Sequence, residues 1–396
     1  MKKYLIIFIA ALLALSTPAL AVQKKIAVKK IEQIAAVPSA ELLVANNSQI
    51  VLISNDDSVT ADISLSALDG TGNLFWKQTI DSGLDEIAMA AAQDSAGNLW
   101  LAGFSATASA QETLTPTVIS ENPDAVLIEL SQGSRSDLNR LTIWKLSSGG
   151  ELEATYFSNE NFAGLINGIS VNSTGLTVVG QYNQRSFIQN MDLSGTFGKV
   201  SFIGTEKSSF NSVVRNPDGS ASIFGSSSEA LGGKKLAAKQ DGILAKISKS
   251  GSLSNVVRSF ATKAERSWLT ADSRFLLSGY VKVGKKIDTA ITKFKSNFAP
   301  VWTIRIPSTG ESAAISAGKK SVAAISSVSS VNSLAGWNPA APSLLILTFN
   351  SKGLITSAVG SSELSSPIAL SRSKELGVIG LAKSTEGVSV LFRVTK

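Results

Sequence analysis

The chain has 396 residues and a formal net charge of +7, and it contains no cysteine and no histidine. The absence of cysteine excludes disulfide bonds within the chain and lipid attachment through a cysteine. Without either residue type, the usual zinc ligands and the commonest general base are missing. The mild positive charge does not by itself indicate nucleic-acid binding. We therefore expect no metal site, no cofactor and no nucleic-acid partner.

The first residues have the pattern of an export signal. Lys2 and Lys3 precede an apolar stretch, Leu5–Leu15, that is too short to span a bilayer, and Ala19-Leu-Ala21 fits a cleavage site of the small-x-small type. We predict a signal peptide over residues 1–21 and one domain over residues 22–396. The protein is then expected to be secreted, or located in the periplasm or cell envelope. We expect a monomer with no membrane span after removal of the signal.

One sequence unit is repeated seven times along the rest of the chain. Each copy has a short apolar run that follows a polar turn and ends in Gly or Ser. A period of roughly 45 to 55 residues with four strand-like pieces per unit is typical of a β-propeller. We predict an all-β fold, a seven-bladed β-propeller of four-stranded antiparallel blades. The apolar runs are Val51–Ser54, Trp100–Gly103, Thr177–Gly180, Ser222–Gly225, Leu276–Gly279, Val322–Ser326 and Gly377–Gly380.

Before the first unit, Lys25–Ile34 also has a strand-like pattern, but the first three strands of a unit do not precede it. Six units carry a recognisable turn between their third and fourth strands, and the last unit does not. We predict that this N-terminal strand closes the last blade as its outer strand, because closure removes an open sheet edge. The innermost strands are expected at Glu41–Ala45, Glu86–Ala92, Ile166–Val171, Asn211–Val214, Ser267–Thr270, Ala313–Ser316 and Pro367–Leu370.

Two turn-and-strand segments, Leu68–Trp76 and Asp94–Gly103, carry a resemblance to a known group of proteins. They resemble the repeats of bacterial exported seven-bladed β-propeller proteins, a family whose function is mostly unknown. A more distant likeness is to quinoprotein propellers, with Trp76 and Trp302 at equivalent positions. The other units lack this Trp, so quinone chemistry is not carried over. Asp94–Asn98 offers one carboxylate, and we interpret it as a turn rather than as a calcium site.

Three connections between second and third strands are long, at residues 106–140, 226–240 and 328–342. In a propeller these connections share one face, and long loops on a rigid scaffold often carry binding residues. Lysines gather on this predicted face, where they would form either an anion-binding patch or a solvated surface. Trp337 would either stack on a sugar or cap a blade. The candidate binding residues are Lys234, Lys235, Lys239, Lys282, Lys285, Lys286 and Trp337.

These features favour a non-catalytic extracytoplasmic binding or scaffold protein. It would recognise a protein partner, an acidic polymer or a glycan through the long loops on one propeller face. The alternative is a carbohydrate-active enzyme that uses carboxylates near the central channel; several carboxyl groups with raised pKa values should then converge in one deep pocket. A third possibility is assembly with a partner through the 106–140 insertion.

Overall fold

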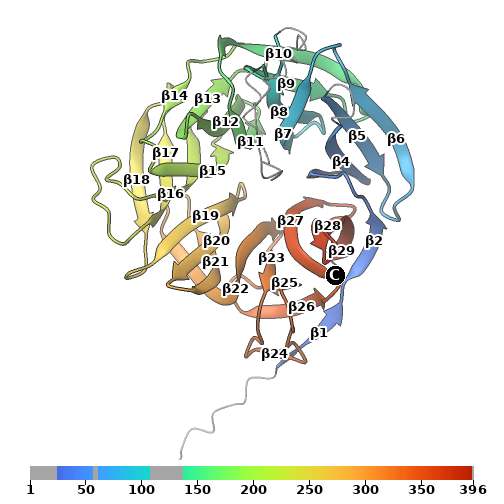
Figure 1. Cartoon of the computed structure of the whole chain (residues 1–396), viewed down its shortest axis with the longest axis vertical. Helices are drawn as coiled ribbons and strands as arrows, with labels where there is room; N and C mark the ends of the chain where they lie inside the picture. Colours follow the sequence, from blue (N-terminus) through green and yellow to red (C-terminus); the bar gives the residue numbers. More distant parts are fainter. Residues whose placement is uncertain (1–24, 57–60, 108–136, 395–396) are drawn as a thin grey trace, which may run out of the picture.

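The computed structural model describes residues 25–56, 61–107 and 137–394. The predicted signal peptide and most of the 106–140 connection lie outside these residues. Within them, no helix has the length and apolar character needed to cross a bilayer. The described chain is all-β, and its sheets are arranged around a central axis as a β-propeller (Figure 1).

Five of the sheets are separate four-stranded antiparallel blades. The first contains β3 (Leu42–Asn46), β4 (Gln49–Asp56), β5 (Asp62–Leu68) and β6 (Leu74–Ile80); the second β7 (Glu86–Gln93), β8 (Leu99–Ser105), β9 (Arg140–Leu146) and β10 (Leu152–Asn161); the third β11 (Leu165–Asn172), β12 (Gly175–Tyr182), β13 (Arg185–Met191) and β14 (Ser201–Phe202); the fourth β15 (Ser208–Arg215), β16 (Ala221–Ser227), β17 (Asp241–Ile247) and β18 (Leu253–Ser259); the fifth β27 (Leu364–Ser373), β28 (Gly377–Ser384), β29 (Ser389–Val394) and β2 (Glu32–Ala36).

The remaining strands form one nine-stranded sheet, so the prediction of seven blades is wrong: the structure has five four-stranded blades. The order in the large sheet is β19 (Glu265–Ala271), β20 (Leu276–Val283), β21 (Lys286–Phe294), β22 (Pro300–Ala317), β23 (Lys320–Ser327), β25 (Ser343–Phe349), β26 (Ile355–Ser361), β1 (Ile26–Lys30) and β24 (Leu334–Ala335).

The physical reason for the large sheet is the length of β22, which has 18 residues. Its first half pairs with β21 as far as Pro307, and its second half pairs with β23 from Ser308 onward. A seven-bladed ring with an innermost strand at Ala313–Ser316 would need a loop between these halves. A bulge between Ser308 and Ser312 replaces it, with Gly310 at a φ of 104°. A bulge bends a strand without ending it, so the hydrogen-bond ladder continues.

The N-terminal segment is two strands rather than the single strand expected at Lys25–Ile34. β2 pairs antiparallel with β29 and is the outer strand of the last blade. β1 instead pairs in parallel with β26 and β24 of the nine-stranded sheet. Residues 26–36 therefore bridge two sheets, and we call this segment the N-terminal clasp. Ile31, between its two strands, is 4% exposed and packs in a core cluster built from both sheets.

The core lies between the faces of neighbouring sheets. One cluster, for example, joins Ile53 of β4 to Leu101 of β8 and Trp144 of β9.

Several of the repeated apolar runs end in a glycine because a side chain would not fit there. Each lies opposite a bulge on the innermost strand, where an added Cβ would lie 1.8–2.1 Å from a backbone carbonyl oxygen. These glycines are Gly103, Gly180, Gly225 and Gly279.

Candidate functional site

The lysine-bearing connection between β16 and β17 is held in place by a buried ion pair. Asp241, at the start of β17, is fully buried and accepts hydrogen bonds from the backbone N–H groups of Ala237 (2.9 Å) and Ala238 (3.0 Å). Arg258 of β18 lies 2.9 Å from the same carboxylate and donates to the carbonyl oxygen of Glu229. The buried pair thus holds the connection at Glu229 and again at Ala237 and Ala238, which gives the loop a defined position.

The connection between β20 and β21 lies at the equivalent position of the next repeated unit, and the end of the first connection contacts Ala264, just before β19, and Tyr280 of β20. The backbone N–H of Lys239 donates to Ala264 (3.2 Å), and Gln240 Nε2 donates to Tyr280 Oη (3.4 Å). Lys282 Nζ lies 3.7 Å from Glu265 Oε2. These contacts fix the end of the first connection, and Lys282, against β19 and β20. The predicted lysines are Lys234, Lys235 and Lys239 on the first connection, Lys282 near the end of β20, Lys285 in the turn after it, and Lys286 at the start of β21.

Arg266, at the start of β19, is a cation of this surface that the sequence analysis missed. Its side chain is only 9% exposed, and its guanidinium carbon lies 4.3 Å from the centre of the Trp268 ring. Among the described residues it has no ion-pair partner, and its Nε has no hydrogen-bond partner. Burial, and to a lesser extent the charge of Arg305, lowers the pKa of Arg266 to about 10. The alternation Arg266-Ser-Trp268 at a strand start was the available sequence signal.

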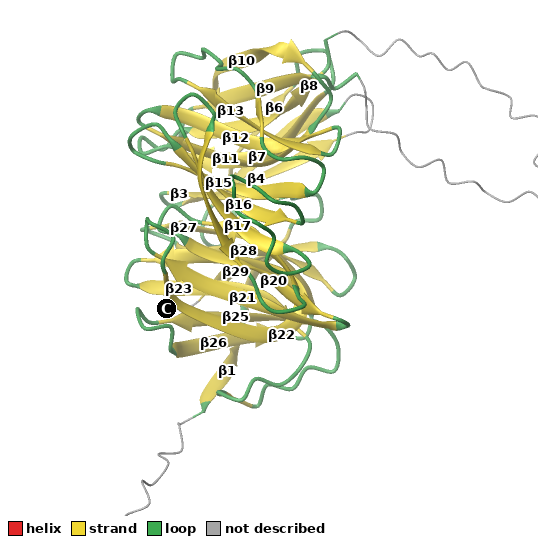
Figure 2. Cartoon of the chain, turned by 90° about the vertical axis from the view of Figure 1, so that its left-hand side faces the viewer, coloured by secondary structure: helices red, strands yellow, loops and turns green. Residues whose placement is uncertain are grey.

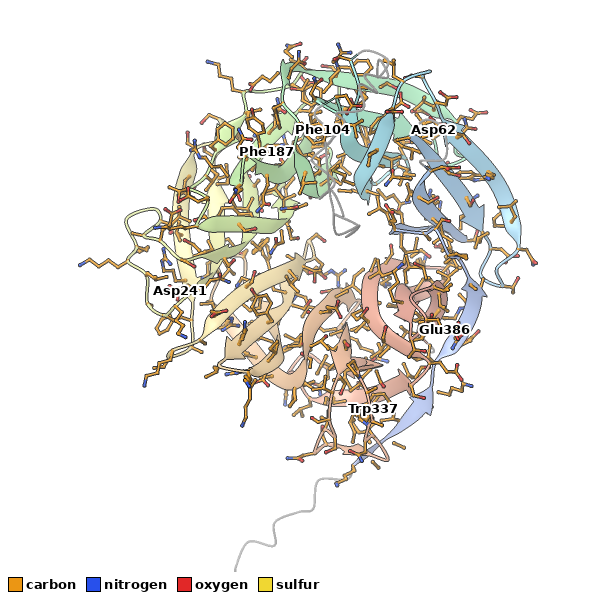
Figure 3. The ribbon with its side chains drawn as sticks, in the orientation of Figure 1. Asp62, Phe104, Phe187, Asp241, Trp337 and Glu386 are labelled. Carbon is orange, nitrogen blue, oxygen red and sulfur yellow. The ribbon has the colours of Figure 1, made fainter. Side chains whose placement is uncertain are left out.

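Trp337 lies apart from Asp241, the residue that anchors the β16–β17 connection (Figure 3). Its indole N–H donates to Ser327 Oγ at 3.0 Å, and its ring packs against Gly360, where no Cβ would fit. The connection that carries it is held by pairing of β24 with β1 of the N-terminal clasp. The ring also lines a cavity of about 460 Å³ together with Lys30 and other residues. Trp337 thus caps its sheet, and part of it still faces a cavity.

A second basic surface lies at the other ends of the strands, where the short turns gather. Lys319, Lys320, Arg372 and Lys374 line a groove of about 400 Å³ between the nine-stranded sheet and the last blade. Its floor contains the apolar side chains of Val322, Val378 and Val394. Figure 2 shows the ring edge-on, with loops on both of its faces. The binding face predicted from the long loops was only one of the two.

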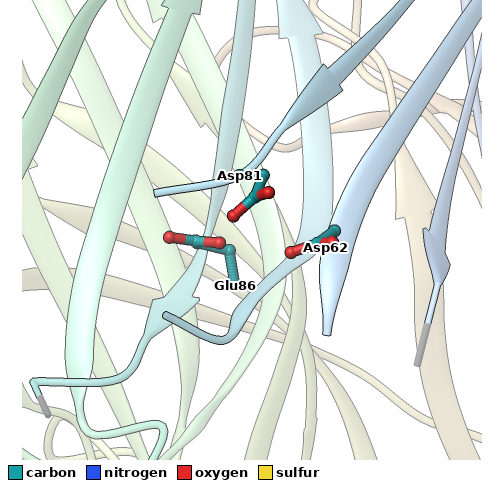
Figure 4. Close-up of side chains that lie close together, drawn as sticks. All are labelled: Asp62, Asp81 and Glu86. Atoms are coloured by element: carbon teal, nitrogen blue, oxygen red, sulfur yellow. The ribbon is translucent and has the colours of Figure 1, made fainter. Parts of the chain in front are cut away.

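Three carboxyl groups that are distant in sequence converge near the first two blades (Figure 4). Asp62 begins β5, Asp81 follows β6, and Glu86 begins β7; one carboxylate oxygen from each lies within 4.8 Å of the others. Glu86 is 2% exposed. Burial raises its pKa, a hydrogen bond from Ser82 opposes this, and the charges of Asp62 and Asp81 raise it further.

This cluster is the convergence of carboxyl groups that the enzymatic alternative requires, but its geometry does not fit that chemistry. A glycosidase needs two carboxyl groups about 5–9.5 Å apart with the sugar between them. Here one oxygen from each group lies within 4.8 Å of the others, and Glu86 is too enclosed for a sugar to reach it. The arrangement is suited to sharing a proton or a cation.

The turn over Asp94–Asn98 has the expected structural role. Asp94 Oδ1 accepts the backbone N–H groups of Ala96 and Asn98, both at 2.9 Å, and Oδ2 accepts the indole N–H of Trp100 at 2.9 Å. Burial of Asp94 acts to raise its pKa, but the hydrogen bonds from Trp100 and Asn98 outweigh it, so the pKa is lowered. The carboxylate is occupied by the turn that it forms.

No protein-family model matches this chain, and no curated protein matches it. The resemblance to exported bacterial propellers therefore stays a prediction. Three similar solved structures are BBS1N in complex with ARL6DN, the Dos1 propeller, and the β-propeller domain of the trilobed protease from Pyrococcus furiosus. Sequence identities are 11%, 11% and 10%, and TM-scores are 0.48, 0.48 and 0.47. The alignments cover 93%, 92% and 93% of this chain and 98%, 82% and 97% of the others, respectively.

Proposed function

We propose that this protein is a non-catalytic extracytoplasmic binding module that recognises an acidic polymer or partner through its lysine surface. This surface comprises the β16–β17 and β20–β21 connections and Arg266. The observation that supports the proposal best is the buried Asp241–Arg258 pair, which fixes the β16–β17 connection. Burying an ion pair is costly, so its use to hold an exposed loop suggests that the position of the loop matters.

The charges of the surface support an anionic ligand. Lys234, Lys235 and Lys239 are exposed, and Arg266 is a buried guanidinium without a carboxylate among the described residues. An Arg held against an aromatic ring presents a fixed donor fork, which suits carboxylate and phosphate groups better than a mobile ammonium does. Flexible lysines around it would add long-range attraction and faster association.

The test measures binding of polygalacturonate, an acidic glycan, to the immobilised protein by biolayer interferometry at low and physiological salt. We expect Lys234→Glu combined with Lys235→Glu to weaken binding at least tenfold, and Arg266→Gln to weaken it to a similar extent. The matched control is Lys319→Glu combined with Lys374→Glu in the groove at the other ends of the strands. It causes the same change in net charge, and its effect should stay below twofold.

Three results would contradict the proposal. Equal losses in both charge-reversed proteins would show unspecific attraction to a basic molecule. A loss confined to the groove variant would move the binding site to the other face. No binding of polygalacturonate or of poly-L-glutamate, even at low salt, would remove acidic polymers as the ligand class.

A further inference from the structure

Glu86 is a buried carboxylate with an incomplete set of hydrogen bonds. Its Oε1 accepts a hydrogen bond from Ser82, but its Oε2 is buried and has no hydrogen-bond partner among the described residues. A buried carboxylate oxygen that has lost its water normally gains a donor or a cation in exchange. The two charged neighbours that act on Glu86, Asp62 and Asp81, are both negative and make its position less favourable.

The backbone holds these groups in place. The N–H of Glu86 donates to the carbonyl oxygen of Ala61, and the N–H of Ala61 donates to Asp85 Oδ1 at 2.8 Å. The start of β5 is thus tied to the start of β7, which fixes Asp62 relative to Glu86. Asp81 comes from the short connection that joins β6 to β7, and it is exposed. Two of the three carboxyl groups therefore stand on a rigid frame, and the third faces solvent.

The spacing of the oxygens fits one shared ion. Calcium binds oxygen ligands at about 2.3–2.6 Å, so two ligands of one calcium ion lie at most about 5 Å apart. The oxygens of Asp62, Asp81 and Glu86 all lie within 4.8 Å of one another. Grouped acids are common on protein surfaces and would not identify an ion site alone. The second observation is the enclosed Oε2 of Glu86, which has no hydrogen-bond partner among the described residues; Figure 4 shows the Glu86 carboxylate beside those of Asp81 and Asp62.

We propose that Asp62, Asp81 and Glu86 bind one calcium ion, which neutralises the buried oxygen of Glu86 and joins the first blade to the second. Solvent reaches the ion on the Asp81 side, and water molecules complete its coordination. The site lies far around the ring from Asp241 and the lysine surface, as Figure 3 shows for Asp62, so it is independent of the proposed polymer binding. Its contribution is to the stability and the fixed angle of these two blades.

The test uses the full chain, freed of divalent ions with a chelator and then titrated with CaCl₂ alone. Binding is followed by calorimetry and by displacement of luminescent Tb³⁺, and the melting temperature is measured with calcium and with EGTA. We expect one ion per chain and a rise of a few degrees in melting temperature, because calcium would bind only the folded protein. A dissociation constant between about 10⁻⁴ and 10⁻³ M is typical of extracellular calcium modules.

Two variants and one control make the result decisive. Glu86→Gln keeps the size of the buried side chain, and Asp81→Asn keeps the size of an exposed one and the oxygen that accepts the Gly83 N–H. Both should weaken calcium binding at least tenfold. Glu151→Gln, an exposed carboxylate on a turn of the second blade, should leave binding unchanged.

The proposal would be overturned by an unchanged melting temperature and no calorimetric signal with calcium, which would assign the cluster to a shared proton. It would also be overturned if calcium bound with equal affinity after Glu86→Gln and Asp81→Asn. Should Glu86→Gln not fold, Asp81→Asn alone decides between these outcomes.

Discussion

Replacing Ile31 with alanine tests whether the N-terminal clasp is part of the core. Ile31 is 4% exposed and packs in a cluster with Val359 of the nine-stranded sheet and Leu364 and Phe392 of the last blade. The change removes three carbon groups at about 0.8 kcal/mol each, which is about 2.4 kcal/mol of lost burial. The cavity left between the two sheets adds to this, so the total lies in the range of about 2–5 kcal/mol.

The assay is urea denaturation followed by tryptophan fluorescence, with the free energy of unfolding and the slope compared between variants. A loss of this size is a large share of the stability of a typical domain, about 5–15 kcal/mol. Lys29→Ala is the matched control, because Lys29 is an exposed residue of β1 in the same clasp. It should change the free energy by less than about 0.5 kcal/mol.

A result for Ile31→Ala within about 0.5 kcal/mol of the parent protein, with the same slope, would refute the reasoning. The clasp would then lie on the surface without sealing the junction between the two sheets. A large effect in the Lys29→Ala control would be equally damaging, because it would show that stability depends on the surface of β1 rather than on the buried side chain.

Three further changes test other parts of the fold. Asp94→Ala should lower the free energy of unfolding by about 2 kcal/mol at pH 7, because charged hydrogen bonds are lost. The pKa of Asp94 is lower in the folded protein than its ordinary value of 3.8, so the stabilisation is present above pH 3.8 and is lost as the pH falls below that value. The free energies of unfolding of parent and variant should therefore converge in acid. Asp241→Asn should cost about 3–5 kcal/mol in thermal or urea unfolding, and limited proteolysis should cut the β16–β17 connection faster; equal cleavage would contradict the anchoring role. Gly225→Ala should cost about 1–3 kcal/mol through its clash with a backbone carbonyl, whereas Gly149→Ala, where the nearest atom to an added Cβ is 3.6 Å away, should be close to neutral in the same urea titration.

Local patterns in the sequence predicted the strands well, because each strand carries its own alternation and each hairpin its own turn residues. The innermost strand expected at Glu86–Ala92 is observed at Glu86–Gln93, and the expected Asp94–Asn98 turn has the hydrogen bonds of a turn. The predicted number of blades was wrong because it depends on whether the strand ends or only bulges near Gly310. A glycine in sequence is compatible with both.

The candidate sites were less accessible to sequence reasoning, because they are made by contacts between units. Asp62, Asp81 and Glu86 were each visible as acids at the edges of strands, yet only the packing of two blades brings their oxygens together. In the same way, the unpaired state of Arg266 depends on which acids the neighbouring strands place nearby. Features that depend on one loop alone, such as exposed lysines, could be predicted from the sequence.

The unbroken course of β22 has a consequence for how the ring comes apart. Asp288 holds one half of this strand and Ser327 holds the other, at adjacent positions of the same backbone. Peeling away either neighbour leaves the next residues of β22 without support on that side, so an opening at one flank lowers the resistance at the other. Elsewhere in the ring, one blade can open without its neighbours. At β22 the parts of the sheet on either side share one strand, so we expect them to open together under heat or mechanical load.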